Sequence, residues 1–369
     1  MAARRWALVA ALAALACVLP TVVASLPTGS AEPGADRLRQ LVLDSADQPY
    51  VGYARAQAEL GLPDLPDLGN LSGLLSGTTD IRVWYRSDQH KRVDVIDTVG
   101  ERDVYTTPTG EYTWDYGIDL LTRIVGSEPV RLPEAGDLVP PDLARRVLRL
   151  DPADPVASLP TRRIAGIDAA GLRLRPTDPA TTVGQVDMWV DPANGLPLRV
   201  EITPRGAAQP ILTSQFLDLS QAAPDSSTLT PPVSGAGGVS TATAPDVLGA
   251  LNTLGRFPLP RLLAGYPLQP QLAGLPGVGR YGAGLATFVV LPLPGNVGSS
   301  AIRTALTAGA TQLTMQRGRA VLIGIPMLSV LLEQAGFGRR TYLVAGLVTP
   351  AVLRQAATQL ATLRGRPVR

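Results

Sequence analysis

The pattern of hydrophobic and polar positions changes its period along the chain. Apolar side chains between Leu38 and Ala46 recur at the spacing of three and four residues that is typical of an amphipathic helix, so we expect one helix over residues 34–46. From residue 81 onward the pattern changes to short apolar runs bounded by Gly, Pro and Asp, which favours an antiparallel meander. The predicted strands are Ile81–Tyr85, Lys91–Asp97, Arg102–Thr107, Glu111–Tyr116, Arg162–Asp168, Gly171–Arg175, Gln185–Val190, Leu198–Thr203 and Ile211–Leu217.

Two of these strands flank a strong turn signal. Asn194 and Gly195 both tolerate positive φ, so the pair predicts a hairpin between Gln185–Val190 and Leu198–Thr203. The apolar residues of the two arms fall on one face, which predicts a sheet with one apolar side. They are Val186, Met188, Val190, Leu198, Val200 and Ile202, whereas Asp187, Arg199 and Glu201 are expected on the opposite, water-facing side.

A second unit follows a stretch of different composition. Residues 221–247 are mostly Ser, Thr, Ala, Gly and Pro, which bury too little apolar surface to offset the entropy of ordering, so we predict a linker. Residues 248–369 then read as a smaller α+β unit whose last helix begins after Thr349, with Pro350 at its first position. The predicted elements of this unit are the strands Ala286–Leu291, Ala320–Ile325 and Thr341–Ala345 and a helix over Ser300–Ala308.

The first 31 residues have the layout of an export signal. Arg4 and Arg5 precede an uncharged apolar run from Trp6 to Ser25, and small residues follow it. The run is long enough to span a bilayer if it is not cleaved, so cleavage and retention as a membrane anchor both stay open. Acylation of Cys17 is a third alternative. All three place the rest of the chain outside the cytoplasm.

Composition and charge narrow the function classes. Apolar residues make up 45% of the 369 residues, which excludes disorder as the dominant state. The formal net charge is only +2, so no long-range field favours nucleic acid as a partner. The single cysteine excludes an internal disulfide and a cysteine-based zinc site, and His90 is the only histidine. We therefore expect no enzyme, no metal and no cofactor.

Three groups of residues suggest chemistry but favour ordinary explanations. Gly277, Gly279 and Gly282 match the dinucleotide fingerprint, yet a strand rather than a helix is predicted after them. His90 lies in a polar turn, and the chain has no nucleophile elbow to partner it. Four carboxylates are expected to pair across strands with arginines instead of forming a catalytic pair. They are Glu101, Asp103, Glu111 and Asp115, opposite Arg82, Arg92 and Arg102.

Short motifs resemble known families. The run Val186-Asp187-Met188-Trp189-Val190-Asp191, followed by Gly195-Leu196-Pro197-Leu198-Arg199, resembles the periplasmic lipoprotein-carrier (LolA-like) superfamily. The runs Gly284–Val290 and Tyr342–Pro350 resemble the C-terminal unit of the MucB/RseB group, which regulates an envelope-stress sigma factor. The first resemblance covers roughly residues 33–220 and the second roughly 278–363. The arginine-rich composition suggests an actinobacterial relative.

This resemblance implies a fold and a domain layout. The fold class is mainly β (α+β): an unclosed antiparallel β-barrel that cups a helix and has an apolar interior able to take acyl chains, followed by a smaller C-terminal α+β domain. The expected layout is a signal peptide or anchor over 1–31, a half-barrel over 32–220, the linker over 221–247 and the C-terminal domain over 248–369.

Candidate binding residues follow from the strand pattern. Tyr112, Trp114 and Tyr116 alternate, so their rings project to one face of one strand. Together with apolar positions of neighbouring strands they either line a cavity that buries a lipid tail, at about 0.8 kcal/mol per CH₂ group, or form the closed core of the barrel. The full candidate set is Val83, Tyr85, Val93, Val95, Tyr112, Trp114, Tyr116, Met188, Leu198 and Val200.

A leucine-rich segment precedes the meander. Its leucines recur every third residue among Pro63, Pro66 and Gly69, which favours a polyproline-like or 3₁₀ loop over an α-helix. The segment is either a lid over the cavity mouth or a loop packed against the barrel. The leucines are Leu62, Leu65, Leu68, Leu71 and Leu74.

Two functions remain in view. The first is a non-enzymatic cell-envelope protein that binds a lipid or lipoprotein acyl group in an apolar β-cup, as a carrier or a sensor, at the membrane surface. The alternative is a regulatory protein that controls an anti-sigma factor or another membrane partner through its C-terminal domain. A pure carrier should work without residues 248–369, whereas a regulator should fail without them.

Overall fold

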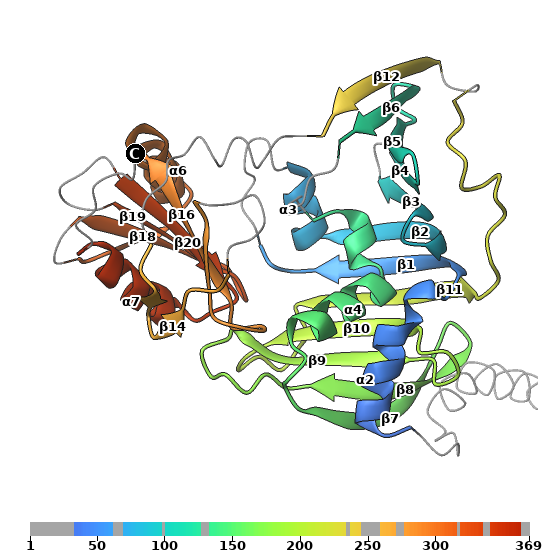
Figure 1. Cartoon of the computed structure of the whole chain (residues 1–369), viewed down its shortest axis with the longest axis horizontal. Helices are drawn as coiled ribbons and strands as arrows, with labels where there is room; N and C mark the ends of the chain where they lie inside the picture. Colours follow the sequence, from blue (N-terminus) through green and yellow to red (C-terminus); the bar gives the residue numbers. More distant parts are fainter. Residues whose placement is uncertain are drawn as a thin grey trace, which may run out of the picture.

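The structure, a computed structural model, contains two large β-sheets that lie side by side (Figure 1) and one small two-stranded sheet. It describes residues 33–61, 69–97, 100–126, 133–233, 237–244, 259–270, 277–315, 318–334 and 340–362. No helix in these ranges is long and apolar enough to cross a membrane. The predicted signal or anchor over residues 1–31 lies outside them.

A twelve-stranded sheet forms the N-terminal domain. Its spatial order is β12-β6-β5-β4-β3-β2-β1-β11-β10-β9-β8-β7, and every neighbouring pair is antiparallel except β12 with β6. The described strands do not close into a barrel, which confirms the predicted unclosed sheet. The strands are β1 Tyr50–Ala58, β2 Thr78–Ser87, β3 His90–Asp97, β4 Gly100–Thr107, β5 Gly110–Asp115, β6 Leu120–Val125, β7 Val156–Ile164, β8 Ile167–Leu174, β9 Val183–Val190, β10 Pro197–Pro204, β11 Leu212–Ser220 and β12 Gly238–Thr243.

Helices cover one face of this sheet, which we call the inner face. In Figure 1, α2 (Ala35–Asp44) and α4 (Pro140–Leu150) lie across strands β8 to β11. Apolar side chains of both helices are buried in one core with side chains of β2, β9 and β10. Two short 3₁₀ turns, η1 (Ser45–Asp47) and η2 (Ala135–Leu138), lead into this layer.

The β9–β10 turn positions α2. Gly195 adopts φ +77°, the left-handed conformation that the turn requires and that glycine adopts without strain. A Cβ atom on Gly195 would lie 2.2 Å from the carbonyl oxygen of Leu41, so the helix backbone rests directly on the turn. The predicted hairpin and its glycine therefore also determine how closely the helix packs on the sheet.

Several elements differ from the sequence expectation. The predicted strand Arg162–Asp168 is wrong, because Ala165 and Gly166 both have positive φ and form the turn between β7 and β8. Strands β1 and β6 and helix α4 were not predicted. Helix α3 (Gly69–Ser76) replaces the C-terminal half of the expected leucine-rich loop, since both prolines of that segment precede Gly69.

The C-terminal domain is a six-stranded antiparallel sheet with one helix on each face. Helix α6 (Gly295–Thr307) packs on one face and α7 (Pro350–Leu360) on the other, with Thr349 and Pro350 at its start as predicted. The strand order is β15-β16-β20-β19-β18-β17, and β13 and β14 form a separate two-stranded sheet. The strands are β13 Leu262–Leu263, β14 Tyr266–Pro267, β15 Gly279–Tyr281, β16 Phe288–Pro294, β17 Thr311–Leu313, β18 Arg319–Gly324, β19 Ser329–Gln334 and β20 Arg340–Gly346.

The predicted linker is partly built into the N-terminal sheet. Six of its residues form β12, which pairs with the outer edge of β6 (Figure 1). Arg86 donates a hydrogen bond to the Ser226 hydroxyl at 3.0 Å, and Leu229 is buried. The described part of residues 221–247 is therefore attached to the sheet over much of its length. Main-chain pairing holds β12, and side-chain contacts of Ser226 and Leu229 hold the part of the segment before it.

The two domains are joined by main-chain contacts far from that linker. The connection between β8 and β9 runs along the C-terminal domain, where the Thr182 N–H donates to the Leu347 carbonyl at 3.0 Å and the Thr349 N–H donates to the Ala180 carbonyl at 2.7 Å. Leu285 of the C-terminal domain belongs to the core of the N-terminal one. These contacts make a continuous two-domain body.

Candidate functional site

The predicted cup residues on the inner face lie in a closed core. Met188, Leu198 and Val200 are fully buried and share one cluster with Leu38 and Val42 of α2. The other members on this face are Val83, Tyr85 and Val93, which are buried, and Val95, which is partly buried. The helices occupy the side of the sheet on which an acyl chain would lie. In this conformation the inner face is packed, and access to it requires the helices to move.

Two tyrosines and an arginine pack at one end of the same core. Tyr85 stacks on Tyr50, with ring centroids 5.0 Å apart, and its hydroxyl donates to the Ala46 carbonyl at 2.6 Å. Burial raises the pKa of both phenols, so both remain neutral. Arg145 of α4 is buried beside them and donates to Asp142 at 2.6 Å. The ring of Tyr85 therefore anchors the chain between α2 and β1 and contributes to the core.

The aromatic strand belongs to the opposite, outer face. Val93 pairs with both Val83 and Val104 across the strands, so the inner face continues through Val104 to Thr113 of β5. Trp114 pairs with Asp103 instead, which places Tyr112, Trp114 and Tyr116 on the other side of the sheet. Trp114 clusters there with Tyr105, Leu121 and Tyr112. The prediction that the aromatic strand and the valine pairs line one cavity is wrong, because cross-strand register decides the face.

Arg92 is the centre of this outer-face cluster. Its guanidinium donates two hydrogen bonds of 2.7 Å to Asp94 and one of 2.8 Å to Asp103. The same guanidinium lies over the rings of Trp84 and Tyr105, 4.7 and 5.0 Å from their centroids, at cation–π distance. The pairing of Arg92 with Asp103 confirms one of the predicted cross-strand ion pairs, and Arg102 with Asp115 at 3.5 Å confirms a second.

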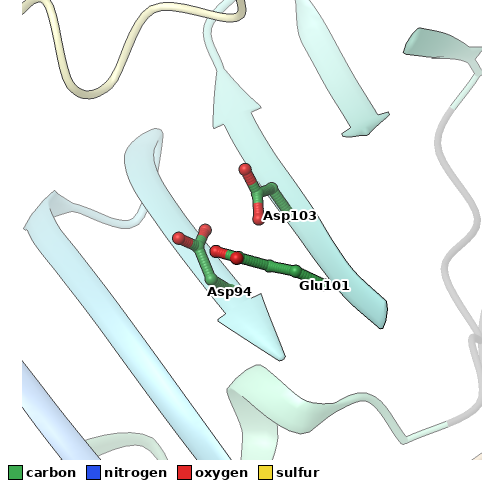
Figure 2. Close-up of side chains that lie close together, drawn as sticks. All are labelled: Asp94, Glu101 and Asp103. Carbon is green, nitrogen blue, oxygen red and sulfur yellow. The ribbon is translucent and has the colours of Figure 1, made fainter. Parts of the chain in front are cut away.

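The carboxylates of the cluster are spaced as in a metal site, but the cation between them is the Arg92 guanidinium. Carboxylate oxygens of Asp94, Glu101 and Asp103 lie within 4.8 Å of one another, and Figure 2 shows the three side chains converging from β3 and β4. Arg92 already donates to two of the three carboxylates. A divalent ion would have to share them with a guanidinium, so the arrangement fits an arginine-centred ion-pair cluster better than a metal centre.

Burial changes the protonation of these acids. Desolvation, together with the neighbouring charge of Asp103, raises the pKa of Asp94 to about 7, and desolvation also raises the pKa of Asp103. One arginine faces two buried carboxylates, so near neutral pH the pair holds a proton part of the time. The Oδ1 atom of Asp103 and the Nε1 atom of Trp114 are buried without a hydrogen-bond partner.

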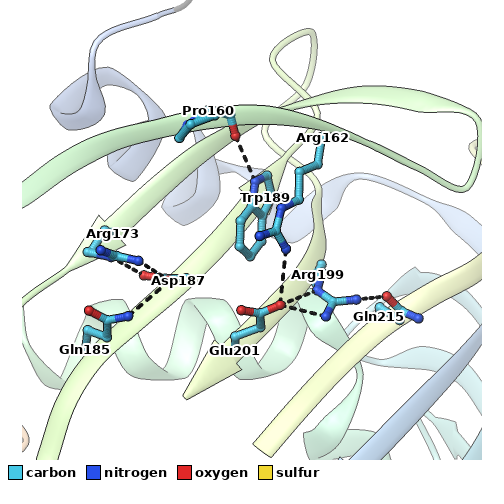
Figure 3. Close-up of polar contacts among 9 residues, drawn as sticks. All are labelled: Pro160, Arg162, Arg173, Gln185, Asp187, Trp189, Arg199, Glu201 and Gln215. Carbon is cyan, nitrogen blue, oxygen red and sulfur yellow. Dashed lines mark hydrogen bonds and ion pairs between the residues drawn. The ribbon is translucent and has the colours of Figure 1, made fainter. Parts of the chain in front are cut away.

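The motif that carries the lipoprotein-carrier resemblance is structural in this chain. Val186, Met188 and Val190 point into the core, as predicted, while Trp189 lies on the outer face beneath Arg162, whose Cζ atom is 3.9 Å from the ring centroid. The indole N–H of Trp189 donates to the Pro160 carbonyl at 3.1 Å, at the bulge of β7. Figure 3 shows this contact within a network of polar and charged side chains on β7 to β11.

That network replaces the water contacts expected on the outer face. Arg173 donates two hydrogen bonds of 2.6 Å to Asp187, and Arg199 donates to Glu201 at 2.7 Å (Figure 3). Arg162 also reaches Glu201, at 3.3 Å. Asp187, Arg199 and Glu201 are thus on the predicted face but are paired: Asp187 and Glu201 with arginines of other strands, and Arg199 with Glu201 on its own strand. Cross-strand charge pairs of this kind stabilise a sheet surface.

The remaining sequence candidates are distributed as follows. Leu74 lies on α3 and packs partly buried against the inner-face core, and Leu71 lies on the same helix. Leu62, Leu65 and Leu68 lie outside the described residues. The glycines 277, 279 and 282 lead through β15 into β16 rather than into a helix, so the dinucleotide context is absent there. His90 is exposed at a turn, with Ser87 Oγ 3.4 Å from its Nδ1.

A site that the sequence did not indicate lies where the domains meet. The carboxylate of Asp151, at the end of α4, accepts a hydrogen bond of 3.4 Å from the N–H of Leu285. A Cβ atom on Gly284, which has φ +56°, would lie 2.7 Å from the same carboxylate. Burial, and the neighbouring Asp154, raise the pKa of Asp151 to about 6. Gly284 and Leu285 of the C-terminal domain thus pack directly against an acid of the N-terminal domain.

Comparison with solved structures finds the same arrangement in another protein. The complex of MucA and MucB from Pseudomonas aeruginosa contains a chain that matches 90% of this chain and 98% of its own length, with 16% sequence identity and a TM-score of 0.50. MucB in complex with MucA(peri) matches over the same shares, with 15% identity and a TM-score of 0.49. A LolA superfamily protein from Nitrosomonas europaea covers 55% of this chain and 99% of its own, with 13% identity and a TM-score of 0.25.

Sequence comparison adds no relative. No family model matches the chain, and no curated protein matches it. At 16% identity the likeness to MucB concerns the fold, and it extends through both domains. The actinobacterial origin suggested by the composition stays a prediction. The chain therefore has the two-domain architecture of the MucB/RseB type, a helix-covered half-barrel followed by a smaller α+β domain.

Proposed function

We propose that this protein is a non-enzymatic regulator of the cell envelope that holds a membrane-anchored partner and responds to an acyl chain bound on the inner face of its N-terminal sheet. The observation that carries this proposal is the MucB-like fold over both domains, which is seen in a complex of MucB with MucA. The export signal over residues 1–31 supports a site of action outside the cytoplasm, whether the signal is cleaved, retained as an anchor or acylated at Cys17.

The domain junction supports a regulator over a simple carrier. Leu285 of the C-terminal domain is buried in the N-terminal core, and the Thr181 hydroxyl lies 2.7 Å from the Leu285 carbonyl and 2.9 Å from the Leu347 carbonyl. A ligand that moves the helices of the half-barrel would therefore also disturb contacts of the C-terminal domain. Coupling of this kind needs two states that differ in these contacts.

The inner face offers the chemistry for an acyl chain. Its wall is built from buried aliphatic and aromatic side chains of β2, β9 and β10, and α2 and α4 together cover the inner face, α2 over β7 and β8 and α4 over β10 and β11. Each CH₂ group that replaces a helix side chain there contributes about 0.8 kcal/mol, so a chain of a dozen carbons can offset the cost of moving one short helix. Arg39 holds α2 in place by donating to the carbonyl of Pro152 at 3.1 Å and to that of Asp154.

This arrangement gives a direct test of ligand binding. Arg39→Ala removes the contacts that hold α2 and should strengthen binding of a fluorescent fatty acid several-fold, because less free energy is spent on opening. Arg37→Ala is the matched control, since Arg37 is exposed on the same helix. Equal affinities in the wild type and both variants, or no binding at all, would remove the acyl ligand from the proposal.

The second candidate function is a lipid carrier without a regulatory partner. The half-barrel and its apolar wall favour it, because these features alone suffice for carrying. A carrier should retain acyl binding and transfer after removal of residues 248–369. A regulator should lose control of its partner. Because the truncation also removes Leu285, it exposes the part of the N-terminal core that Leu285 covers, and the truncated domain should be less stable.

A further inference from the structure

The strand β12 is an unusual part of the N-terminal sheet. It comes from the Ser/Thr/Ala/Gly/Pro segment between the domains and makes the one parallel pairing among the described strands of that sheet. None of its residues is buried, and Val239 is 58% exposed. Its neighbour β6, in contrast, places Leu121 fully buried against Trp114. β12 thus contributes to the sheet without contributing to a core.

Main-chain bonds hold β12 in place. The Gly238 N–H donates to the Asp119 carbonyl at 3.1 Å, and the Ala244 N–H donates to the Val125 carbonyl at 2.9 Å. In a parallel pair only alternate residues bond to the neighbour, so the N–H groups of Ser240 and Ala242 also face β6. Those of the odd residues face the open edge. One side-chain bond, between Thr122 and Ser240 with oxygens 2.9 Å apart, is added.

The outer face of this edge is apolar and incompletely covered. Val239 lies beside Leu121, and Thr243 lies beside Val125, which is 45% exposed. Tyr116 and Ile118 are exposed at the adjacent β5–β6 turn. A strand with larger apolar side chains at the positions of Val239 and Thr243 would cover more of this surface than β12 does, at about 25 cal/mol for each Å² of apolar surface that it buries.

The start of the strand is restricted by shape. A Cβ atom on Gly237 would lie 2.3 Å from the Asp119 carboxylate, and one on Gly238 would lie 3.2 Å from the Leu120 side chain. Between the two apolar positions, Thr241 lies beside Arg123, an exposed arginine that an acidic residue would complement. The edge of β6 therefore selects two glycines, then an apolar residue, an acidic one and a second apolar one at alternate positions.

We propose that β12 is a displaceable cover, and that the edge of β6 beneath it is a docking site for an extended segment of a partner protein. That segment runs parallel to β6 with glycines at the positions of Gly237 and Gly238 and apolar side chains at those of Val239 and Thr243. β-strand addition to an exposed edge is a general mode of peptide recognition. This inference rests on the proposed function only for the natural partner, the extracytoplasmic part of a membrane-anchored protein.

Competition with the tethered strand decides the affinity. Because β12 is part of the same chain, it acts at an effective concentration on the order of millimolar. A partner strand makes the same main-chain bonds to β6 as β12 does, so it can bind more tightly than β12 only through its side chains. An isoleucine in place of Thr243 should raise the affinity about tenfold by covering Val125. The cover therefore excludes polar peptides and admits apolar ones.

The test uses the full chain in three forms. Ser240→Pro with Ala242→Pro removes two N–H groups that face β6 and should release β12. Thr241→Pro is the matched control, since its N–H faces the open edge, where proline is tolerated. Hydrogen exchange at the amides of Leu121, Arg123 and Val125 reports whether the edge is open, and we expect at least tenfold faster exchange in the double variant alone.

Binding is then measured by fluorescence anisotropy with a labelled peptide of residues 237–244. We expect it to bind the double variant and not the wild type or the Thr241→Pro control, and the same peptide with Thr243→Ile to bind about tenfold more tightly. A Thr122→Cys, Ser240→Cys pair tests the intact cover with the Thr243→Ile peptide, which competes with tethered β12: the reduced pair should bind this peptide, and the oxidised pair, in which a disulfide locks β12, should not. Circular dichroism verifies that each variant is folded.

Three results would overturn the proposal. Amide exchange that does not change in the folded double variant would show that β12 does not cover the edge. An open edge that binds neither peptide would show that it is not a docking site. Equal, measurable binding of the Thr243→Ile peptide to the oxidised and the reduced cysteine pair would place the peptide elsewhere. Neither readout involves an acyl chain, so failure of the ligand part of the proposed function is seen separately.

Discussion

The two faces of the N-terminal sheet bury their side chains by different means. On the inner face, helices α2 and α4 cover aliphatic residues such as Met188 and Val200, and the core is apolar. On the outer face of β3 to β5, the cover is made by the sheet's own side chains, with Arg92 between two rings and two buried acids. The inner face depends on apolar packing and the outer face on a balance of charge, so substitutions and pH should affect them differently.

The largest expected effect is a charge on the inner face. Val200→Asp places a carboxylate among α4 and β9 side chains with no partner, at a cost of several kcal/mol, enough to unfold a domain of ordinary stability. Leu217→Asp, on the exposed side of β11, is the control and should change stability by less than about 0.5 kcal/mol. Thermal unfolding measures both, and a folded Val200→Asp protein would contradict a closed inner core.

Loss of the outer-face arginine should have the next largest effect. Arg92→Met leaves Asp94 and Asp103 buried without a counter-charge, which typically costs about 3–5 kcal/mol. The cost should be greatest above pH 7 and smaller at pH 5, because Asp94, whose pKa burial raises to about 7, is protonated at pH 5. Arg123→Met, which removes an exposed arginine that contacts Tyr112, serves as the control in urea unfolding at both pH values. An effect of the same size at pH 5 and pH 8 would argue against the buried acid pair.

The C-terminal domain offers a contrast to the Arg92 cluster, because it buries an acid that has no hydrogen-bond partner. Both carboxylate oxygens of Glu333 on β19 are buried and unbonded, and burial raises its pKa to about 8. The folded state therefore binds a proton that the unfolded state releases above pH 4.5, so stability falls as pH rises from about 4.5 to about 8.

Glu333→Met should remove that pH dependence. We expect a gain of about 4 kcal/mol at pH 8 and almost none near pH 4.5, measured by urea unfolding across this range. Gln312→Met, on exposed β17, is the control. A variant whose stability still falls with pH as the wild type's does would show that another group is responsible.

The smallest effect is expected at the exposed end of the aromatic strand. Tyr116 stacks on Trp114 with centroids 5.2 Å apart but is 48% exposed. Tyr116→Ser should cost about 1 kcal/mol of stability and leave fatty-acid binding unchanged, because the ring is on the outer face. Weaker fatty-acid binding in the folded variant would return this strand to the ligand site.

The sequence predicted one half of the sheet better than the other for a physical reason. In β9 and β10 the apolar and polar residues alternate around a glycine turn, with Trp189 as the exception, so the buried face could be read from a single hairpin. Around Trp114 both faces carry large side chains, and the buried partners on the outer face are charged. Alternation then groups residues onto a face but does not say which face is inside, since register across four strands decides that.

Two further elements show what the pattern could and could not supply. Helix α4 had readable signals, with Pro140 and Pro141 in its first turn and Asp142 beside them, although it was not predicted. Strand β12 had none, because its side chains do not determine its pairing; the main chain does. The antiparallel meander depends on apolar periodicity and could be predicted, and the unclosed half-barrel followed from the family resemblance, whereas edge pairing and the contacts between the domains could not be predicted.

Hydrogen exchange with and without a ligand is the most direct test of acyl-chain binding on the inner face. We propose that an acyl chain enters under α2 on the inner face and leaves the Arg92 cluster intact. With a 14-carbon lysophospholipid below its micelle concentration, the amides of α2 should lose protection while those of β4 and β5 keep theirs. Unchanged protection in α2, or changes confined to β4 and β5, would contradict it.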